Sequence, residues 1–203
     1  MSTLEHLTLH SEDYVGLWPK LDLTSTHFPR LTSLMLKRFT FFEDAQLDWI
    51  LSHGATLREL RLDTCIIIWA VTCYAKDYHD PFNVEIPEES DNPEASMKVY
   101  HTYPKRWHDH FTSFRTGIPL LRRFWFDGTF YVNPFKKCMD LFKFACSRYN
   151  YHVFDHEALV ALSPHSIAPE ELEGAPTCFE EDVEALRSLL QKAEQTFLAR
   201  TEA

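Results

Sequence analysis

A motif of the form Leu-x-x-Leu-x-Leu recurs along the first part of the chain at nearly constant spacing. It occupies Leu4–Leu9, Leu31–Leu36 and Leu57–Leu62, so that successive copies begin 27 and then 26 residues apart. An aromatic version follows at Leu121–Phe126. The last two apolar residues of each copy are two positions apart, which places them on the same face of a strand. A fixed period of this kind predicts a stack of similar units and constrains the fold more than any other feature.

The segments between the motifs predict how each unit returns to the next strand. Residues 44–53 carry apolar side chains at helical spacing, and Gly54 follows as a helix stop just before the third motif. Residues 107–116 repeat this arrangement at the same distance before the aromatic motif. A short strand followed by a helical return is the unit of a leucine-rich repeat. We therefore predict an α/β leucine-rich-repeat solenoid of about four parallel-strand and helix units.

Two other segments are expected to interrupt and to close this solenoid. Residues 77–97 contain seven acidic residues, three prolines and no Lys or Arg, so we assign 76–100 to an acidic loop insertion. The leucine-rich-repeat domain then spans 1–154 and ends in a capping strand near 149–154. Residues 155–203 hold an irregular segment and an amphipathic helix, which begins at a capping box formed by Thr177 and Glu180. This helix either covers the last unit or docks on a partner, and we favour the cover.

Composition and charge exclude several classes of function. The chain is 45% hydrophobic, too apolar for a disordered protein, yet its apolar runs are too short to span a bilayer. We expect a cytoplasmic or nuclear location, no membrane partner, and five reduced cysteines that need no disulfide or metal. Residues 98–148 are basic, but the net charge of −10 argues against nucleic acid as a partner.

The expected binding site is the sheet face that the motif leucines do not occupy. Side chains alternate along a strand, so the residues between the leucines point to this open face. Stacking the motifs aligns Met35, Arg61 and Trp125 in one column, and places Lys37 where it can pair with Asp63. Met, Arg and Trp are enriched at protein interfaces. The candidate partner-binding residues are Met35, Lys37, Arg61, Asp63, Arg123 and Trp125, unless the insertion or the C-terminal helix covers them.

The sequence offers little for catalysis. It has only five glycines and no Gly-rich phosphate loop, and no Ser or Cys lies in a motif that would activate a nucleophile. We therefore expect no enzyme activity and no cofactor. An alternative is a metal-dependent enzyme using the cluster His101, His108, Asp109 and His110. Residues 108 and 110 of a helix point to different sides, so we do not expect a metal there.

Several segments together carry a likeness to a known family: Phe28–Phe41, Leu47–Leu51, Thr56–Cys65, Ile118–Phe124, the Tyr-rich strand near 149–154 and the acidic closing helix around Glu184–Leu190. They resemble the repeat region of fungal F-box proteins. The resemblance implies a leucine-rich-repeat scaffold that recognises protein substrates for a ubiquitin ligase.

The resemblance covers the repeats and not the F-box itself. In that family the F-box is an N-terminal helical module that docks on the adaptor of a cullin-type ligase, whereas here a repeat motif already begins at Leu4. We therefore expect no binding to the ligase adaptor without an F-box. A second alternative is a truncated repeat remnant without activity of its own.

Overall fold

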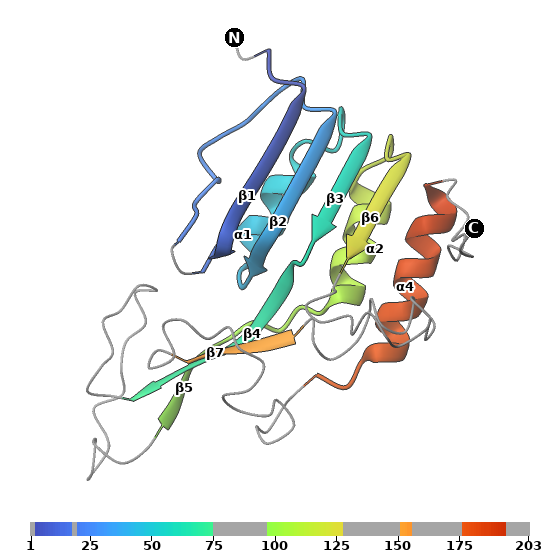
Figure 1. Ribbon diagram of the computed structural model, residues 1–203. Helices are drawn as coiled ribbons and strands as arrows, with labels where there is room; N and C mark the ends of the chain where they lie inside the picture. The colour runs from blue at the N-terminus through green and yellow to red at the C-terminus, as the bar shows by residue number, and fades with distance from the viewer. Residues whose placement is uncertain (1–2, 18–19, 75–96, 128–150, 156–175, 194–203) are drawn as a thin grey trace, which may run out of the picture.

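Four parallel strands, in the order β1-β2-β3-β6, form the main part of the sheet (Figure 1). The computed structural model describes residues 3–17, 20–74, 97–127, 151–155 and 176–193. Within these residues the molecule is a mixed α/β protein whose sheet is mostly parallel and open. The bounds of the four strands are β1 His6–Val15, β2 Ser33–Phe41, β3 Glu59–Asp63 and β6 Arg123–Asp127.

The strands pair in the register that the repeated motif predicts. Leu34 lies opposite Leu60, which in turn lies opposite Phe124, and all three side chains are buried. The pairing of Leu7 with Leu34 extends the same row to β1. The parallel arrangement of the four motifs is thus confirmed, because each motif contributes its apolar side chains to the same face of the sheet.

Two consecutive units also share an unusual backbone conformation just after the motif. Arg38 has φ 53° and Thr64 has φ 57°, and each follows a member of the aligned pair Lys37 and Asp63. A positive φ is rare for a β-branched residue such as Thr64. Its hydroxyl donates a hydrogen bond to the Asp63 carboxylate at 2.9 Å, which helps to hold this conformation. Arg38 lies inside β2, whereas Thr64 lies between the end of β3 and the first strand of a second group of strands.

The second group contains three strands that the sequence analysis placed differently or did not predict. The end of β2 pairs with β4, which pairs antiparallel with β5 and parallel with β7. The apolar run at 65–71 was not predicted to be a strand, although it forms most of β4. The bounds are β4 Ile66–Tyr74, β5 Met97–Thr102 and β7 Tyr151–Asp155.

These strands correct two predictions. Residues 97–100 belong to β5, so the predicted loop 76–100 is wrong at its C-terminal end, while 76–96 lies outside the described residues. The backbone of β4 supplies hydrogen-bond partners to 97–100, which local composition cannot reveal. The strand predicted near 149–154 exists as β7, but it pairs with β4 and does not continue the motif row after β6. The segment 156–175 lies outside the described residues.

Two helices cover one face of the main sheet, behind the strands in Figure 1. They confirm the helices predicted at 44–53 and 107–116, and their bounds are α1 Asp44–Leu51 and α2 Trp107–Gly117. Gln46 stabilises the start of α1 through its side-chain amide. Its oxygen accepts the Phe42 N–H at 2.8 Å, and its nitrogen donates to the Thr40 carbonyl at 3.0 Å. At the start of α2, the Asp109 carboxylate accepts the Arg106 N–H at 2.8 Å.

A third described helix, α4 (Phe179–Lys192), packs beside α2 and next to β6 (Figure 1). Its N-cap is Cys178 and no side chain caps it, so the predicted capping box of Thr177 and Glu180 is wrong. Thr177 is exposed, and the helix start is held instead by contacts of Asp182 with α2. No described helix has the length and apolar character needed to cross a membrane.

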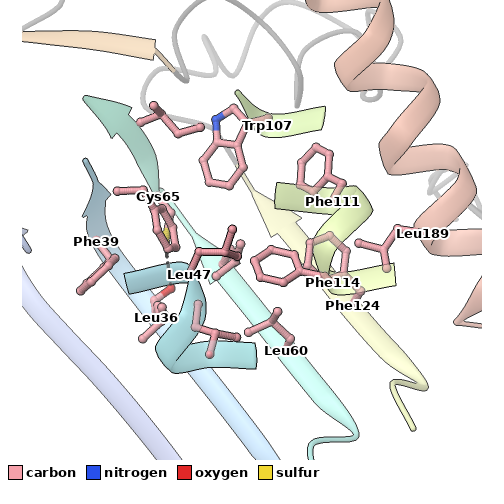
Figure 2. Close-up of a cluster of buried hydrophobic side chains, with 14 of the residues drawn as sticks. Leu36, Phe39, Leu47, Leu60, Cys65, Trp107, Phe111, Phe114, Phe124 and Leu189 are labelled. Atoms are coloured by element: carbon pink, nitrogen blue, oxygen red, sulfur yellow. Dashed lines mark hydrogen bonds between the residues drawn. The ribbon is translucent and has the colours of Figure 1, made fainter. Parts of the chain in front are cut away.

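One continuous apolar core joins the sheet to all three helices. Figure 2 shows Leu36, Leu60 and Phe124 from the sheet packed against side chains of the helices. The aromatic motif adds edge-on ring contacts, such as Phe111 with Phe124, whose centroids are 5.9 Å apart. Leu189 of α4 is fully buried in this same core. The predicted C-terminal helix therefore exists as α4 and packs into the core that the sheet shares with α1 and α2.

Candidate functional site

The open face of the sheet carries all six predicted partner-binding residues. The aligned column of Met35, Arg61 and Trp125 runs across β2, β3 and β6. Arg61 and Trp125 are exposed, and Trp125 is one of two large apolar side chains that are markedly exposed among the described residues, at 44%. The opposite faces of the same strands are buried under α1 and α2.

Ion pairs on the open face lie both between and within strands. Lys37 Nζ of β2 lies 3.7 Å from Asp63 Oδ2 of β3, as predicted, and Arg61 Nη2 of the same strand β3 lies 3.7 Å from that oxygen. Arg123 Nη1 lies 2.9 Å from Glu59 Oε1. The pair of Arg123 and Glu59 is the more exposed of these, and pairs between exposed side chains contribute only about 0–1 kcal/mol. Arg123 is therefore able to exchange this partner for a group of a bound protein at small cost.

The predicted histidine cluster does not form one site. The ring of His110 is fully buried, and its Nε2 lies 3.2 Å from the Tyr103 hydroxyl. Burial lowers the pKa of His110 to about 3, so the ring is neutral. His101 Nε2 lies 3.0 Å from the Phe42 carbonyl oxygen, and His108 faces α4. The three rings therefore contact three different parts of the chain. His108 and His110 point in different directions, as expected from their two-residue spacing on a helix.

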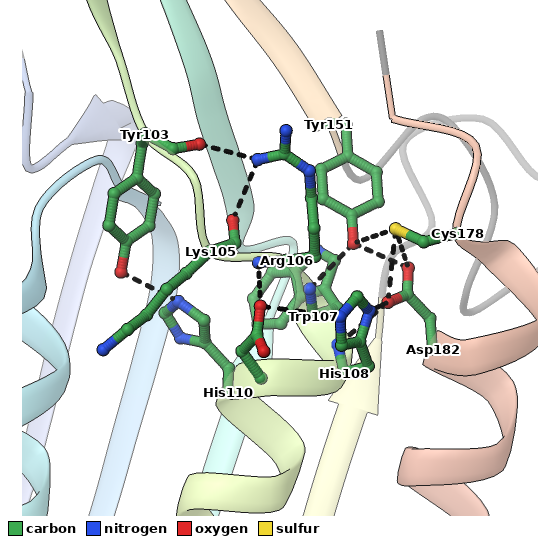
Figure 3. A network of polar contacts seen from close by, with 10 residues as sticks. Tyr103, Lys105, Arg106, Trp107, His108, His110, Tyr151, Cys178 and Asp182 are labelled. Carbon is green, nitrogen blue, oxygen red and sulfur yellow. Dashed lines mark hydrogen bonds and ion pairs between the residues drawn. The ribbon is translucent and has the colours of Figure 1, made fainter. Parts of the chain in front are cut away.

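A buried polar cluster, which we call the α2–α4 cluster, lies where the two helices begin (Figure 3). The carboxylate of Asp182 is fully buried at its centre. Oδ1 accepts the His108 backbone N–H at 2.8 Å and lies 3.0 Å from His108 Nδ1, while Oδ2 accepts the Tyr151 hydroxyl at 2.6 Å. The members of the cluster are His108, Tyr151, Cys178 and Asp182.

Tyr151 connects this cluster to the first turn of α2. Its hydroxyl oxygen accepts the Trp107 N–H at 2.7 Å, while its proton is donated to Asp182. The first N–H groups of a helix have no partner within the helix, so Tyr151 and Asp182 satisfy two of them from other parts of the chain. Burial, followed by the nearby Asp182 charge, raises the pKa of Tyr151. The phenol therefore stays protonated and able to donate.

The Cys178 thiol has the surroundings of an unreactive cysteine. Its Sγ lies 3.6 Å from the Tyr151 hydroxyl and 3.8 Å from Asp182 Oδ1. Burial raises the pKa of Cys178, so that the thiolate, the form that acts as a nucleophile, is disfavoured. The α2–α4 cluster therefore lacks an activated nucleophile for covalent catalysis.

Sequence reasoning missed this cluster because its members are far apart in the chain. His108 and Asp182 are 74 residues apart. One local signal exists: Asp182 lies on the same helical face as Leu186 and Leu189, which are buried. A charged residue on an apolar stripe indicates a buried partner, although it does not identify that partner.

Comparison with known proteins does not assign a family or a function to the chain. No protein-family model, no curated protein and no solved structure matches the chain. The function must therefore be inferred from the geometry of the open face and of the α2–α4 cluster.

Proposed function

We propose that this chain is a protein–protein interaction scaffold, a leucine-rich-repeat solenoid that binds a protein partner on the open face of its sheet. The observation that supports this most is the aligned column of Met35, Arg61 and Trp125, with Trp125 44% exposed. Trp and Arg are the residue types that most often dominate binding energy at interfaces. On this proposal the chain binds and does not catalyse.

The rigidity of the strands supports the proposal. Met35 and Arg61 each lie between two leucines that are buried in the core, and Trp125 lies between buried Phe124 and partly buried Phe126. Binding a partner here costs little conformational entropy, because the strands already fix the backbone on which these side chains lie. The neighbouring Lys37, Asp63 and Arg123 surround the column with charges of both signs, which suits a polar rim.

The resemblance to F-box proteins suggests the class of partner. If it reflects common function, the open face recognises a protein substrate for ubiquitylation in the cytoplasm or nucleus. A metal-dependent enzyme built on His101, His108 and His110 is not favoured, since their rings contact different elements.

A paired comparison of surface variants tests the binding face. The face variant is Arg61→Glu with Trp125→Ala. The matched control is Arg58→Glu with Leu120→Ala, because Arg58 is exposed and Leu120 is 43% exposed, yet neither lies on the open face. Proteins captured from a fungal lysate are quantified by mass spectrometry for the unmodified chain and for both variants.

We expect specific partners to be retained by the control and reduced by at least about tenfold with the face variant, which corresponds to about 1.4 kcal/mol. Thermal melting of both variants should match that of the unmodified chain, because the changed side chains are exposed. Equal capture by the face variant and the control would move the binding site away from the open face.

A further inference from the structure

We propose that His108, Cys178 and Asp182 form a binding site for a divalent transition-metal ion of the zinc class. Among the described residues, these three offer one ligand atom each, and the three atoms all lie within 4.8 Å of one another. They come from the first turn of α2 and from the beginning of α4 (Figure 3). Cys178 and Asp182 are four residues apart, the spacing that places two side chains on the same side of a helix.

The ligand separations are close to those of a tetrahedral zinc site. Zinc bonds of about 2.0–2.1 Å to nitrogen and oxygen and about 2.3 Å to sulfur imply N–O separations of about 3.3 Å and O–S separations of about 3.5 Å. Two of the three observed separations are 3.0 Å between His108 Nδ1 and Asp182 Oδ1, and 3.8 Å between Cys178 Sγ and the same oxygen. Shifts of about 0.3 Å would bring each of these two to its expected value, and the third pair, His108 and Cys178, lies within 4.8 Å.

The surrounding polar contacts resemble those that orient metal ligands. A ligating histidine usually directs its other ring nitrogen to a carboxylate or carbonyl, and His108 Nε2 faces the Asp109 carboxylate, with Oδ2 3.5 Å away. Asp182 Oδ2 is held by the Tyr151 hydroxyl at 2.6 Å, which leaves Oδ1 directed toward His108 Nδ1. In the bound state the ion would lie between Nδ1 and Oδ1, the neutral ring would carry its proton on Nε2, and the Cys178 thiol would release its proton to solvent and bind as thiolate.

Three protein ligands leave a fourth position for water or another ligand. Asp182 is fully buried, whereas the His108 side chain is 31% exposed and Cys178 is partly exposed, so the fourth position lies on the solvent side. The guanidinium of nearby Arg106 donates hydrogen bonds to the carbonyls of Tyr103 and Lys105. Because the ligands come from α2 and from the start of α4, the bound ion would stabilise the packing of α4 against α2.

Cobalt substitution tests the site on the full chain. Protein treated with a chelator is titrated with Co²⁺, and the expected result is one equivalent bound with a thiolate-to-cobalt charge-transfer band and the visible bands of tetrahedral cobalt. One equivalent of Zn²⁺ should remove these bands. Cys178→Ser should abolish the charge-transfer band, whereas the control Cys138→Ser should retain it.

Affinity and stability provide a second readout. His108→Gln should weaken zinc binding by at least about tenfold, while His6→Gln, an exposed residue of β1, should not. Zinc should also raise the melting temperature of the unmodified chain and leave that of Cys178→Ser unchanged. Absence of a charge-transfer band in the unmodified chain, or a band that persists in Cys178→Ser, would overturn the site and leave the cluster as a hydrogen-bonded junction only.

Discussion

Single buried polar side chains connect the irregular parts of the chain to its regular elements. His53, which follows α1, is the clearest case: its Nε2 lies 3.1 Å from the Phe28 N–H and its Nδ1 lies 2.8 Å from the Trp49 carbonyl oxygen. These partners require Nδ1 to carry the proton and Nε2 to accept, so the neutral ring satisfies both. A doubly protonated ring would face the Phe28 N–H with a second donor. Burial accordingly lowers the pKa of His53.

The lowered pKa of His53 predicts that stability falls as the solution becomes acidic. The unfolded chain takes up the proton near pH 6.5, while the folded chain resists it, so the free energy of unfolding is highest above that pH and decreases below it. Urea unfolding of the unmodified chain and of His53→Gln at pH 8, 6 and 5 checks this. The loss of stability from pH 8 to pH 5 should be smaller in His53→Gln.

Other histidines provide the control for this experiment. His110 is also buried with a lowered pKa, so His53→Gln should reduce the pH dependence without removing it. His6→Gln, which changes an exposed ring of β1, serves as the matched substitution control. An identical dependence in the unmodified chain and in His53→Gln would show that His53 protonates equally well in the folded state.

At the scale of elements, the ends of α1 and α2 meet through two glycines. A Cβ atom on Gly54 would collide with the Gly117 carbonyl oxygen, which is rigid backbone. A Cβ atom on Gly117 would meet the end of the Leu51 side chain at 2.8 Å, and that side chain is able to rotate away. Successive units thus approach closely at this point because Gly54 has no side chain.

Alanine substitutions at Gly54 and at Gly117 test this difference between a rigid and an adaptable neighbour. We expect Gly54→Ala to lower the free energy of unfolding by about 1–3 kcal/mol, since the two helix ends must move apart. Gly117→Ala should cost less, because Leu51 adapts and alanine favours the helix more than glycine does. Denaturant midpoints of both variants check the order. A larger loss for Gly117→Ala would contradict this account of the contact.

Helix α4 runs alongside α2 in the same direction and contacts both of its ends. Asp182 accepts the His108 N–H at the start of α2, and Lys192 Nζ donates to the Arg115 and Ile118 carbonyls at its end. Each charge lies at the helix end whose partial charge has the opposite sign. The covering helix is therefore positioned by polar contacts at its ends and by leucines between them.

Removing one hydroxyl from this junction should weaken it measurably. Tyr151→Phe removes both the hydrogen bond that the Trp107 N–H donates to the hydroxyl and the one that Asp182 Oδ2 accepts from it, and we expect a loss of about 1–3 kcal/mol of stability. Arg187→Gln, which breaks an exposed pair with Glu184, should change stability by less than about 0.5 kcal/mol. Equal effects in chemical denaturation would show that the cluster contributes little to holding α4.

At the scale of the whole molecule, one core extends from the leucines of β2 and β3 to those of α4. Leu36 lies within it at 1% exposure, while Thr8 on the neighbouring strand β1 is exposed. A charge buried without a partner costs several kcal/mol, comparable with the total stability of a domain.

Leu36→Asp should therefore abolish cooperative unfolding of the entire molecule, including α4. Thr8→Asp should have a small effect, because its carboxylate stays in water. Circular dichroism melting curves of the two variants, compared with that of the unmodified chain, check this. If Leu36→Asp melts like the unmodified chain, the assignment of the motif leucines to the core is wrong.

The local pattern of apolar residues accounts for most of the main sheet and for the three described helices. Leucines two residues apart, repeated at a nearly constant period, determined which segments are strands, which face is buried and how β1, β2, β3 and β6 align. Apolar residues at helical spacing located α1, α2 and α4. These features are visible in sequence because each depends on burial of one face of a short segment. For the same reason the column of Met35, Arg61 and Trp125 was predictable.

Other features required the tertiary structure, because they depend on pairing between distant segments. The strand β5 exists because β4 supplies its hydrogen-bond partners, and its own sequence shows no strong alternation. The contact of Gly54 with Gly117 and the meeting of His108 with Asp182 also join distant segments. A local sequence pattern indicates that a side chain is buried or that a helix ends. Which group from a distant segment that side chain contacts depends on the positions of all the elements, so only the tertiary structure determines it.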